Sequence, residues 1–260
     1  TVGRRSMNAV SNGTRGAWGG GYDSIIIQDY INVIDYITIG TTGNATDFGD
    51  MTTMHGYAAG SVSNGTRGAW GGGNTGTDTN EISYITIATT GNGTDFGDRT
   101  VTAYVITGVS SSSRGVFGTG YKTSPAGNTN ILDYITIATV GNAVDFGDLS
   151  TPLVRGASGA SDGSRGLFSA GYSDSPSGNK NIITYITIAT TGNSTDFGDL
   201  TETKNNTGSC ASATRGLTAG GEAPSNSNVI DYVTIATTGN AIDFGDLTVA
   251  GNSLGCCSGG

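Results

Sequence analysis

The sequence is poor in the residue types that support most catalytic and metal-binding chemistry. Its 260 residues include one histidine, three cysteines and four prolines, and only 13% are Asp, Glu, Lys or Arg. One histidine cannot form a zinc-binding cluster, and three irregularly spaced cysteines do not form a disulfide framework. Acidic residues outnumber basic ones by 21 to 12, giving a net charge of −9. The chain therefore lacks the basic surface that nucleic acids require, and we expect no nucleic-acid partner.

Long apolar segments and intact terminal signals are also missing. The longest strongly apolar stretch is Ile25-Ile26-Ile27, far shorter than the roughly 18 residues of a membrane span, so no span is expected. No signal peptide is visible, and the chain starts at Thr1 without a methionine. We interpret it as a processed or truncated piece of a protein.

The three cysteines lie in two corresponding small-residue segments. Cys210 precedes Arg215 by five residues, and Cys256 and Cys257 fall in the matching segment that follows. Small buried side chains account for all three. A Cys210–Cys257 disulfide between neighbouring repeats is the alternative.

What the sequence contains instead is one motif repeated five times. A representative copy is YITIATTGNGTDFGD at residues 84–98. A repeat of about 50 residues is typical of solenoids, propellers and arrays. Glycine makes up 45 of the 260 residues, which makes helices costly. The Phe of the DFGD tetrapeptide, which we expect to pack between repeats, recurs at Phe48, Phe96, Phe146, Phe197 and Phe244.

A single repeat predicts four strands. Short strands joined by turn residues form an antiparallel meander. In the third strand of the first repeat, Ile34 and Tyr36 point to one face and Ile37 and Ile39 to the other, so both faces should be covered. The first strand of each repeat consists mostly of small residues. In the third repeat the predicted strands are 101–109, 114–121, 131–139 and 144–149, with a loop at 122–130.

A sheet with small residues at one edge and large ones at the other is a wedge, and four-stranded wedges arranged around an axis form a β-propeller. We therefore predict an all-β fold: one β-propeller domain over residues 1–260, made of four-stranded antiparallel blades. The predicted blades are about 1–50, 51–98, 99–148, 149–199 and 200–246, followed by an extra closing or continuing strand in 247–260.

Two resemblances support this prediction. Residues 114–120 (RGVFGTG), 133–137 (DYITI) and 145–149 (DFGDL) together resemble a degenerate kelch repeat, with the glycine pair of the second strand broken and the late Trp replaced by Phe. Over nearly the whole chain, the sequence is similar to the YITIATTGNATDFGDL-type repeats of tail or virion-associated proteins of marine bacteriophages and of prokaryotic proteins. This resemblance implies a structural or adhesive role, located in a virion or outside the cell, and supplies no catalytic residues.

Two charged residues recur once in every blade. We interpret them as a repeated ion pair or as carboxylates that cap turns, with a ring of binding groups as the alternative. DFGD oxygens could also contribute to a calcium site, although the dense acidic loop of calcium-binding motifs is missing; no cofactor is otherwise expected. The recurring residues are Arg15, Arg67, Arg114, Arg165 and Arg215 at the second strand, and Asp47, Asp95, Asp145, Asp196 and Asp243 at the fourth.

No catalytic site stands out. DFGD is not the kinase DFG, because the partner lysine and catalytic loop of kinases are absent. A triad around His55 has no obvious nucleophile, and we expect His55 to be a surface or turn residue. Asp pairs of the glycosidase type are not marked out. The chain is therefore predicted not to be an enzyme.

The loops between second and third strands vary most between repeats, and rigid scaffolds commonly bind partners through such loops. We predict a structural or adhesive module of a virion or extracellular assembly that contacts other assembly subunits or a host surface. The alternative is a lectin-like propeller that binds glycans between blades. The candidate partner-binding residues are Ile25, Ile26, Ile27, Tyr30, Lys122, Pro125, Pro176, Lys180 and Pro224.

Overall fold

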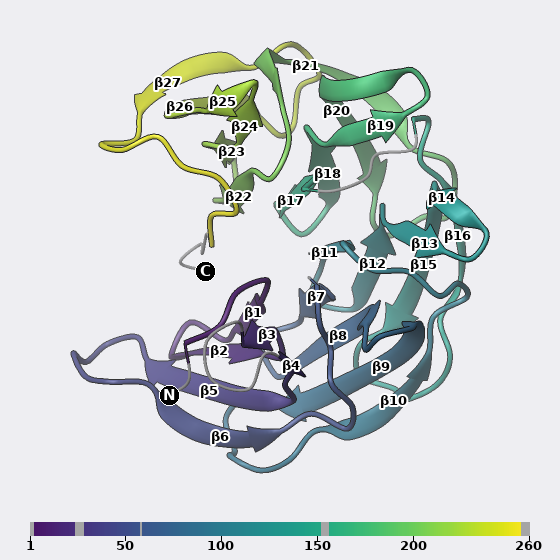
Figure 1. The fold of residues 1–260 in the computed structure, drawn as a ribbon, viewed down its shortest axis with the longest axis vertical. Coiled ribbons are helices and arrows are strands. Elements are labelled where there is room, and N and C mark those ends of the chain that lie inside the picture. Colours follow the sequence, from purple (N-terminus) through teal and green to yellow (C-terminus); the bar gives the residue numbers. More distant parts are fainter. Residues whose placement is uncertain (1–2, 24–28, 58, 152–155, 256–260) are drawn as a thin grey trace. The chain divides into compact units, whose positions relative to one another are not determined.

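The fold is all-β, as predicted. The computed structural model describes residues 3–23, 29–57, 59–151 and 156–255, and these contain no helix. Five four-stranded antiparallel sheets follow one another along the chain (Figure 1). They are the five blades of a β-propeller, which confirms the predicted fold class and repeat number.

The chain forms two compact units. Unit 1 comprises residues 1–117 and 133–145, and unit 2 comprises residues 118–132 and 146–259. The third blade contributes residues to both, and each unit is described by itself.

Unit 1 holds the first two blades and most of the third. Blade 1 contains β1 (Asn8–Ser11), β2 (Arg15–Gly19), β5 (Val33–Thr38) and β6 (Thr46–Asp50), with a small hairpin formed by β3 (Tyr22–Asp23) and β4 (Asp29–Tyr30). Blade 2 contains β7 (Gly60–Ser63), β8 (Arg67–Asn74), β9 (Asp78–Thr86) and β10 (Thr94–Asp98). Blade 3 contains β11 (Thr107–Ser110), β12 (Arg114–Gly118), β15 (Ile131–Thr136) and β16 (Val144–Asp148).

Unit 2 holds the last two blades. A hairpin of β13 (Tyr121–Thr123) and β14 (Ala126–Asn128) precedes them. Blade 4 contains β17 (Ser158–Ser161), β18 (Arg165–Ser169), β20 (Ser177–Thr187) and β21 (Thr195–Lys204), with β19 (Tyr172–Asp174) pairing on β20. Blade 5 contains β22 (Gly208–Ala211), β23 (Arg215–Ala219), β26 (Val229–Thr234) and β27 (Ile242–Asp246), with a hairpin of β24 (Glu222–Ala223) and β25 (Ser225–Asn226).

The third blade differs from the prediction in two places: its first strand is shorter, and its variable loop contains a hairpin. The first strand of blade 3 spans only β11, because residues 101–106 belong to the connection from the preceding blade. The variable loop at 122–130 forms the β13–β14 hairpin, since its two arms pair around Ser124 and Pro125. The length of a first strand is therefore overestimated from sequence, because β-branched residues also line the connection.

The turn after the second strand requires a left-handed backbone. Gly72 has a φ of +74° and Gly73 a φ of +118°, a conformation that glycine adopts without steric cost. In blades 3 and 4 the first position of this pair is taken by Thr119 (φ +64°) and Ala170 (φ +60°). The residues that replace the first glycine thus follow the same backbone path. Their Cβ atoms add the steric energy that a side chain has in the left-handed region.

Neighbouring blades are joined by a repeated contact at the fourth strand. The N–H of Gly91 in blade 2 donates to the carbonyl of Phe48 in blade 1 at 2.8 Å, and the side-chain oxygen of Asn92 accepts from the N–H of Asp50 at 3.1 Å. A Cβ on Gly49 would lie 2.6 Å from the carbonyl group of Gly91. The glycine of DFGD is therefore required by the close approach of the next blade.

The prediction for the DFGD phenylalanines holds for four of the five. Phe48, Phe96, Phe146 and Phe197 are 2–3% exposed, but Phe244 is 51% exposed and the prediction is wrong there. The first four lie beneath the third-to-fourth-strand turn of the following blade, and within the described residues of unit 2 no such turn covers Phe244. Its packing depends on a neighbour rather than on its own repeat.

The predicted extra strand is not seen in residues 247–255, which form a connection instead. The N–H of Leu247 donates to the Asn228 carbonyl at 2.7 Å, and the N–H of Gly221 donates to the Gly251 carbonyl at 2.8 Å. Connections between other blades make the same kind of contact. Residues 256–260 lie outside the described residues, so a strand there stays a prediction, as does the Cys210–Cys257 alternative.

Candidate functional site

The repeated arginines stack on tyrosines of their own blades. Each guanidinium carbon lies 4.5–4.8 Å from the centre of the tyrosine ring in the third strand. Arg15, Arg67 and Arg165 also donate to a carbonyl of the next blade, for example from Arg165 Nη1 to Ile235 O at 2.9 Å. Cation–π stacking of this kind contributes roughly 0.5–1 kcal/mol at exposed sites. These arginines therefore link blades.

Three of the repeated aspartates hydrogen-bond the glycine two residues further on, at a β-bulge inside the fourth strand. Asp95 Oδ1 accepts from the N–H of Gly97 at 2.9 Å, and Asp47 and Asp243 make the same contact with their own glycines. Among the described residues, Arg15, Arg67, Arg165 and Arg215 form no ion pair with a carboxylate. The three aspartates thus satisfy a backbone N–H, but at a bulge inside a strand and not at a turn as predicted. The ion-pair interpretation is wrong for these four arginines, whose guanidinium groups stack on tyrosine rings.

Buried ion pairs occur at a different repeated position, which was not predicted from the sequence. The residue before the third-strand tyrosine is an aspartate in three blades, and each aspartate pairs with a cation from the segment that precedes its blade. The pairs are Arg4–Asp35 at 2.9 Å, Arg99–Asp133 at 3.0 Å and Lys204–Asp231 at 2.8 Å. Removing one partner of such a pair leaves an uncompensated buried charge, so these contacts fix each blade in place.

His55 occupies the corresponding position between blades 1 and 2, and its predicted surface location is wrong. It is 1% exposed, with Nδ1 lying 2.5 Å from the carbonyl of Gly72 and Nε2 3.0 Å from the hydroxyl of Ser83. Because a carbonyl only accepts, Nδ1 carries the proton. Burial lowers the pKa of His55, opposed by the Gly72 hydrogen bond and the charge of Glu81. A neutral imidazole thus faces Ser83 where other blades use a cation and an aspartate.

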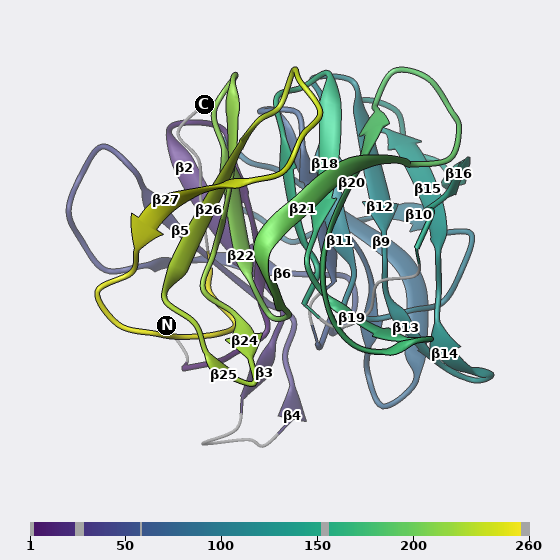
Figure 2. The same ribbon diagram turned by 90° about the horizontal axis from the view of Figure 1, so that it is seen from above.

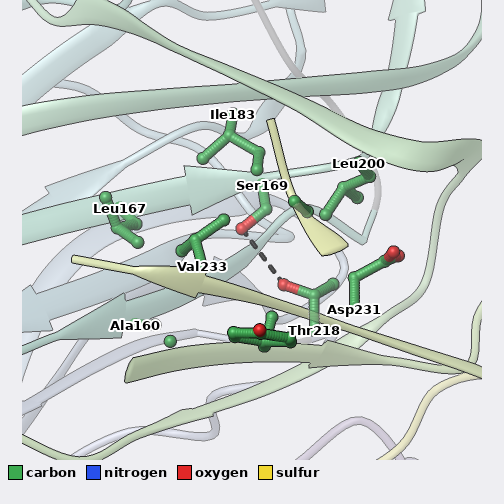
Figure 3. Close-up of a pocket in the computed structure, with 11 residues that line it drawn as sticks. Ala160, Leu167, Ser169, Ile183, Leu200, Thr218, Asp231 and Val233 are labelled. Carbon is green, nitrogen blue, oxygen red and sulfur yellow. Dashed lines mark hydrogen bonds between the residues drawn. The ribbon is translucent and has the colours of Figure 1, made fainter. Parts of the chain in front are cut away.

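Between blades 4 and 5, hydroxyl groups replace an aromatic contact. In blades 2, 3 and 4 an aromatic ring of the second strand packs on a small residue of the preceding blade, as Phe168 does on Gly118. In blade 5 that ring is replaced by Thr218, which donates to Ser169 at 3.3 Å, and Figure 3 shows the two hydroxyls directed at each other. The adjoining cavity has a volume of about 10 Å³, near the minimum for one water. It is too small for a substrate.

Unit 1 contains a tyrosine cluster made of Tyr22, Tyr30, Tyr57 and Tyr104. All four rings are half-buried. Tyr22 and Tyr57 stack with centres 6.1 Å apart, Tyr30 meets both edge-on, and Tyr104 lies 6.1 Å from Tyr57. Arg5 lies 5.4 Å above the Tyr22 ring. The pKa of Tyr30 is raised by partial burial and by the neighbouring Tyr57.

This cluster lies where the variable loop of blade 1 meets the connections between blades. Tyr22 and Tyr30 belong to the β3–β4 hairpin, and Tyr57 and Tyr104 belong to the connections that enter blades 2 and 3. Gly21 at the base of the hairpin donates to the carbonyl of His55 at 3.0 Å. Tyr30 was predicted as a partner-binding residue and lies in the cluster. Ile25, Ile26 and Ile27 lie outside the described residues.

The other predicted partner-binding residues lie in the variable hairpins of unit 2. Pro125, Pro176 and Pro224 are exposed at hairpin tips, while Lys122 and Lys180 are half-buried. Lys180 Nζ donates to the carbonyl of Pro176 at 2.8 Å. In Figure 2 the hairpin strands β19, β24 and β25 lie at the lower edge of unit 2. Asn179 Nδ2 donates to the Glu222 carbonyl at 2.7 Å, so adjacent hairpins are linked.

Unit 1 also contains an open polar hollow between blades 1 and 2. It is lined by Asn32, Thr52, Thr53, Met54, Thr75 and Thr79 and has a volume of roughly 470 Å³. Hydroxyl and amide groups beside an exposed methionine suit a neutral polar ligand better than an ion.

No protein-family model matches the chain, and no curated protein matches it in sequence. Within the described ranges, no three His, Cys, Asp or Glu side chains come together as metal ligands. In the same part of the chain, no helix is long and apolar enough to cross a membrane.

Proposed function

We propose that this chain is a non-enzymatic structural module that mediates protein–protein assembly or attachment to a host surface, within a phage virion or another extracellular assembly. The observation that carries the proposal is the tyrosine cluster. Tyrosine is enriched at the centres of protein interfaces, and binding energy concentrates on packed aromatic residues. Because the four rings pack on one another, little side-chain freedom is lost on binding.

The resemblance to tail and virion-associated repeats gives this role its setting. The partner class is then a structural protein encoded beside this chain. The net charge of −9 favours a partner surface that is not strongly acidic, since like charges that face each other across an interface weaken binding.

A lectin-like function is the second candidate, and the polar hollow favours it. Its threonine hydroxyls and the Asn32 amide can hydrogen-bond sugar hydroxyls, and repeated weak sites would gain avidity when several are occupied. A glycan array with wild-type protein and Thr52→Val separates the candidates. Glycan binding that Thr52→Val abolishes would favour the lectin, and turnover of a polysaccharide would contradict the non-enzymatic proposal.

The direct test uses purified products of the neighbouring genes as probes. Tyr30→Ser combined with Tyr57→Asn removes two rings of the cluster, and Asn tolerates the left-handed backbone of Tyr57 (φ +49°). Tyr172→Ser, at the hairpin position of blade 4 that corresponds to Tyr22, is the matched control. We expect at least a tenfold loss of partner affinity in the double variant and little change in the control. Equal affinity in all three proteins would contradict the assignment of this surface.

A loop exchange tests whether unit 2 takes part. Replacing residues 122–130 by residues 74–80 removes the β13–β14 hairpin and its exposed Pro125, and the fold should survive because blade 2 uses the shorter loop. If the exchange weakens the partner contact while the tyrosine variants do not, binding lies on the hairpins of unit 2.

A further inference from the structure

Three hydroxyl groups connect the polar hollow of unit 1 to the buried His55. We call them the hydroxyl bridge, formed by Thr52, Thr53 and Ser83. Thr52 and Thr53 line the hollow, and Thr52 Oγ1 contacts both Glu81 Oε1 and Ser83 Oγ. Ser83 Oγ lies 3.0 Å from His55 Nε2, and Thr53 Oγ1 lies 3.3 Å from the same nitrogen. Side chains therefore link the hollow to a group that titrates.

The hydroxyl bridge makes four contacts with three hydroxyl protons. Nδ1 of His55 is protonated because it faces the carbonyl of Gly72, so in the neutral ring Nε2 only accepts. The ionised carboxylate of Glu81 also only accepts, and one contact is therefore short of a proton. When Nε2 carries a proton, the ring donates to Ser83, Ser83 donates to Thr52 and Thr52 donates to Glu81, and the shortage is removed.

Protonation of His55 also changes what the hollow offers to a ligand. In the neutral ring, Nε2 accepts the hydroxyl proton of Thr53. Once it is protonated, Nε2 no longer accepts, and Thr53 can direct its proton into the hollow that it lines. The hollow therefore gains a hydrogen-bond donor when His55 is charged.

The surroundings of His55 contain few other groups that titrate. Gly20 of blade 1 and Gly73 of blade 2 lie against its backbone and carry no side chain. Tyr30, which packs on Gly56, has a pKa raised by partial burial and stays neutral in this range. Within the described part of unit 1, Glu81 is thus the charge that faces a proton on His55.

We propose that the polar hollow binds a neutral sugar, and that the bound sugar and a proton on His55 favour each other through the hydroxyl bridge. This rests on the second candidate function, glycan binding, and adds its regulation. The ligand class follows from the wall of the hollow, which combines hydroxyl and amide groups with the exposed Met54 and holds no charged side chain. A sugar oxygen that accepts from Thr53 uses the proton that the neutral ring would take. Because such coupling is reciprocal, lower pH strengthens sugar binding, and the sugar strengthens proton binding.

The proton can be followed directly. His55 is the only histidine of the chain, so an NMR titration of the imidazole signals between pH 7.5 and 5 reports on it alone. The probe is the neutral oligosaccharide that binds best on a glycan array screened at pH 7.5 and 5.5. Saturation with this probe should move the titration midpoint of His55 to higher pH. Calorimetry should show an affinity that rises by roughly fivefold between pH 7.5 and 5.5, a common size for coupling between two sites.

Three variants locate the coupling. Thr53→Val removes the hydroxyl that transmits it and His55→Gln removes the titrating group, so neither variant should bind the probe more tightly at pH 5.5. Thr75→Val, the control, removes a hydroxyl of the hollow that lies outside the hydroxyl bridge. It should change the affinity by the same factor at both pH values. Thermal unfolding at both pH values checks that each variant is folded.

Four results would overturn the inference: no neutral glycan bound at either pH, equal affinity at both, a His55 midpoint that the probe leaves unchanged, or a pH dependence that Thr53→Val retains. If no glycan binds, the lectin-like candidate falls as well, while the assembly role of the tyrosine cluster stands. If a glycan binds equally at both pH values, the inference falls and the lectin-like candidate stands. If the coupling is found but the tyrosine variants bind the partner protein like wild type, the inference stands and the binding role of the tyrosine cluster falls.

Discussion

Blades 4 and 5 carry the same DFGD tetrapeptide in opposite surroundings. Phe197 is 2% exposed beneath the turn of blade 5, and Phe244 is 51% exposed. Both rings keep the same contact inside their own blade, lying edge-on to Tyr185 and Tyr232 at 5.8 and 5.9 Å. The repeat therefore specifies the strand and the ring, whereas burial is specified by the next blade.

The first way to test this comparison is to remove both rings. Phe197→Ala should lower the free energy of unfolding by about 3–5 kcal/mol, because it opens a cavity in a packed contact between blades. Phe244→Ala should cost less than about 1 kcal/mol, the range of surface substitutions. Urea denaturation of both variants measures the difference. Equal costs would mean that the ring contributes mainly within its own blade.

A methyl group at the adjacent glycine sharpens the comparison. Gly198 and Gly245 have nearly the same φ, +144° and +138°, so alanine brings the same backbone strain to both. Only at Gly198 does the new Cβ meet the next blade, 2.5 Å from Gly239. Gly198→Ala should therefore be less stable than Gly245→Ala by about 1–3 kcal/mol, the usual cost of overpacking. A difference near zero in thermal unfolding would show that the contact yields easily.

The repeat explains how much the sequence alone could predict. Period, turn residues and strand alternation predict five four-stranded blades, because these are properties of one repeat. The burial of His55 could not be predicted, since it depends on Gly72 and Ser83 from a different part of the chain. The predicted carboxylate partner of the repeated arginines was also wrong. The sequence does not show whether a guanidinium lies nearer to a tyrosine ring or to a carboxylate, because that depends on how the strands pair.

The buried ion pairs did leave a signal in the sequence. The position before the third-strand tyrosine reads Asp35, Ser83, Asp133, Thr184 and Asp231. Arg4, Arg99 and Lys204 accompany the aspartates, while His55 accompanies Ser83. Aligning the repeats position by position would have shown an aspartate at this position in three of the five repeats.

A smaller difference in stability is expected between the corresponding arginines of blades 4 and 5. Arg165 stacks on Tyr185 and also donates to Ile235 O, whereas Arg215 stacks on Tyr232 and, within the part of the chain that the structure describes, donates to no carbonyl. Arg165→Ala should cost about 1–2 kcal/mol and Arg215→Ala about 0.5–1 kcal/mol, since the first loses a charged hydrogen bond as well as the stacking. Chemical denaturation of both variants checks this, and a larger loss at Arg215 would contradict the assigned contacts.

The smallest expected effect is a pH dependence of stability. It distinguishes the His55–Ser83 contact, whose histidine can titrate, from the contacts that pair Arg or Lys with an aspartate. Burial lowers the pKa of His55 in the folded chain, so below about pH 6.5, the usual value for an unfolded histidine, the unfolded chain binds a proton that the folded chain does not. Stability must therefore fall as the pH falls. Between pH 6.5 and 5.5 we therefore expect wild type to lose stability that a variant without a titrating group at this position keeps. His55→Gln keeps a side chain that can hydrogen-bond Gly72 and does not titrate, so subtracting its urea-unfolding profile from that of wild type removes the shared carboxylate contribution. A flat difference profile from pH 7.5 to 5.5 would mean that the folded chain accepts the proton at His55, with Glu81 as the nearby carboxylate able to stabilise it.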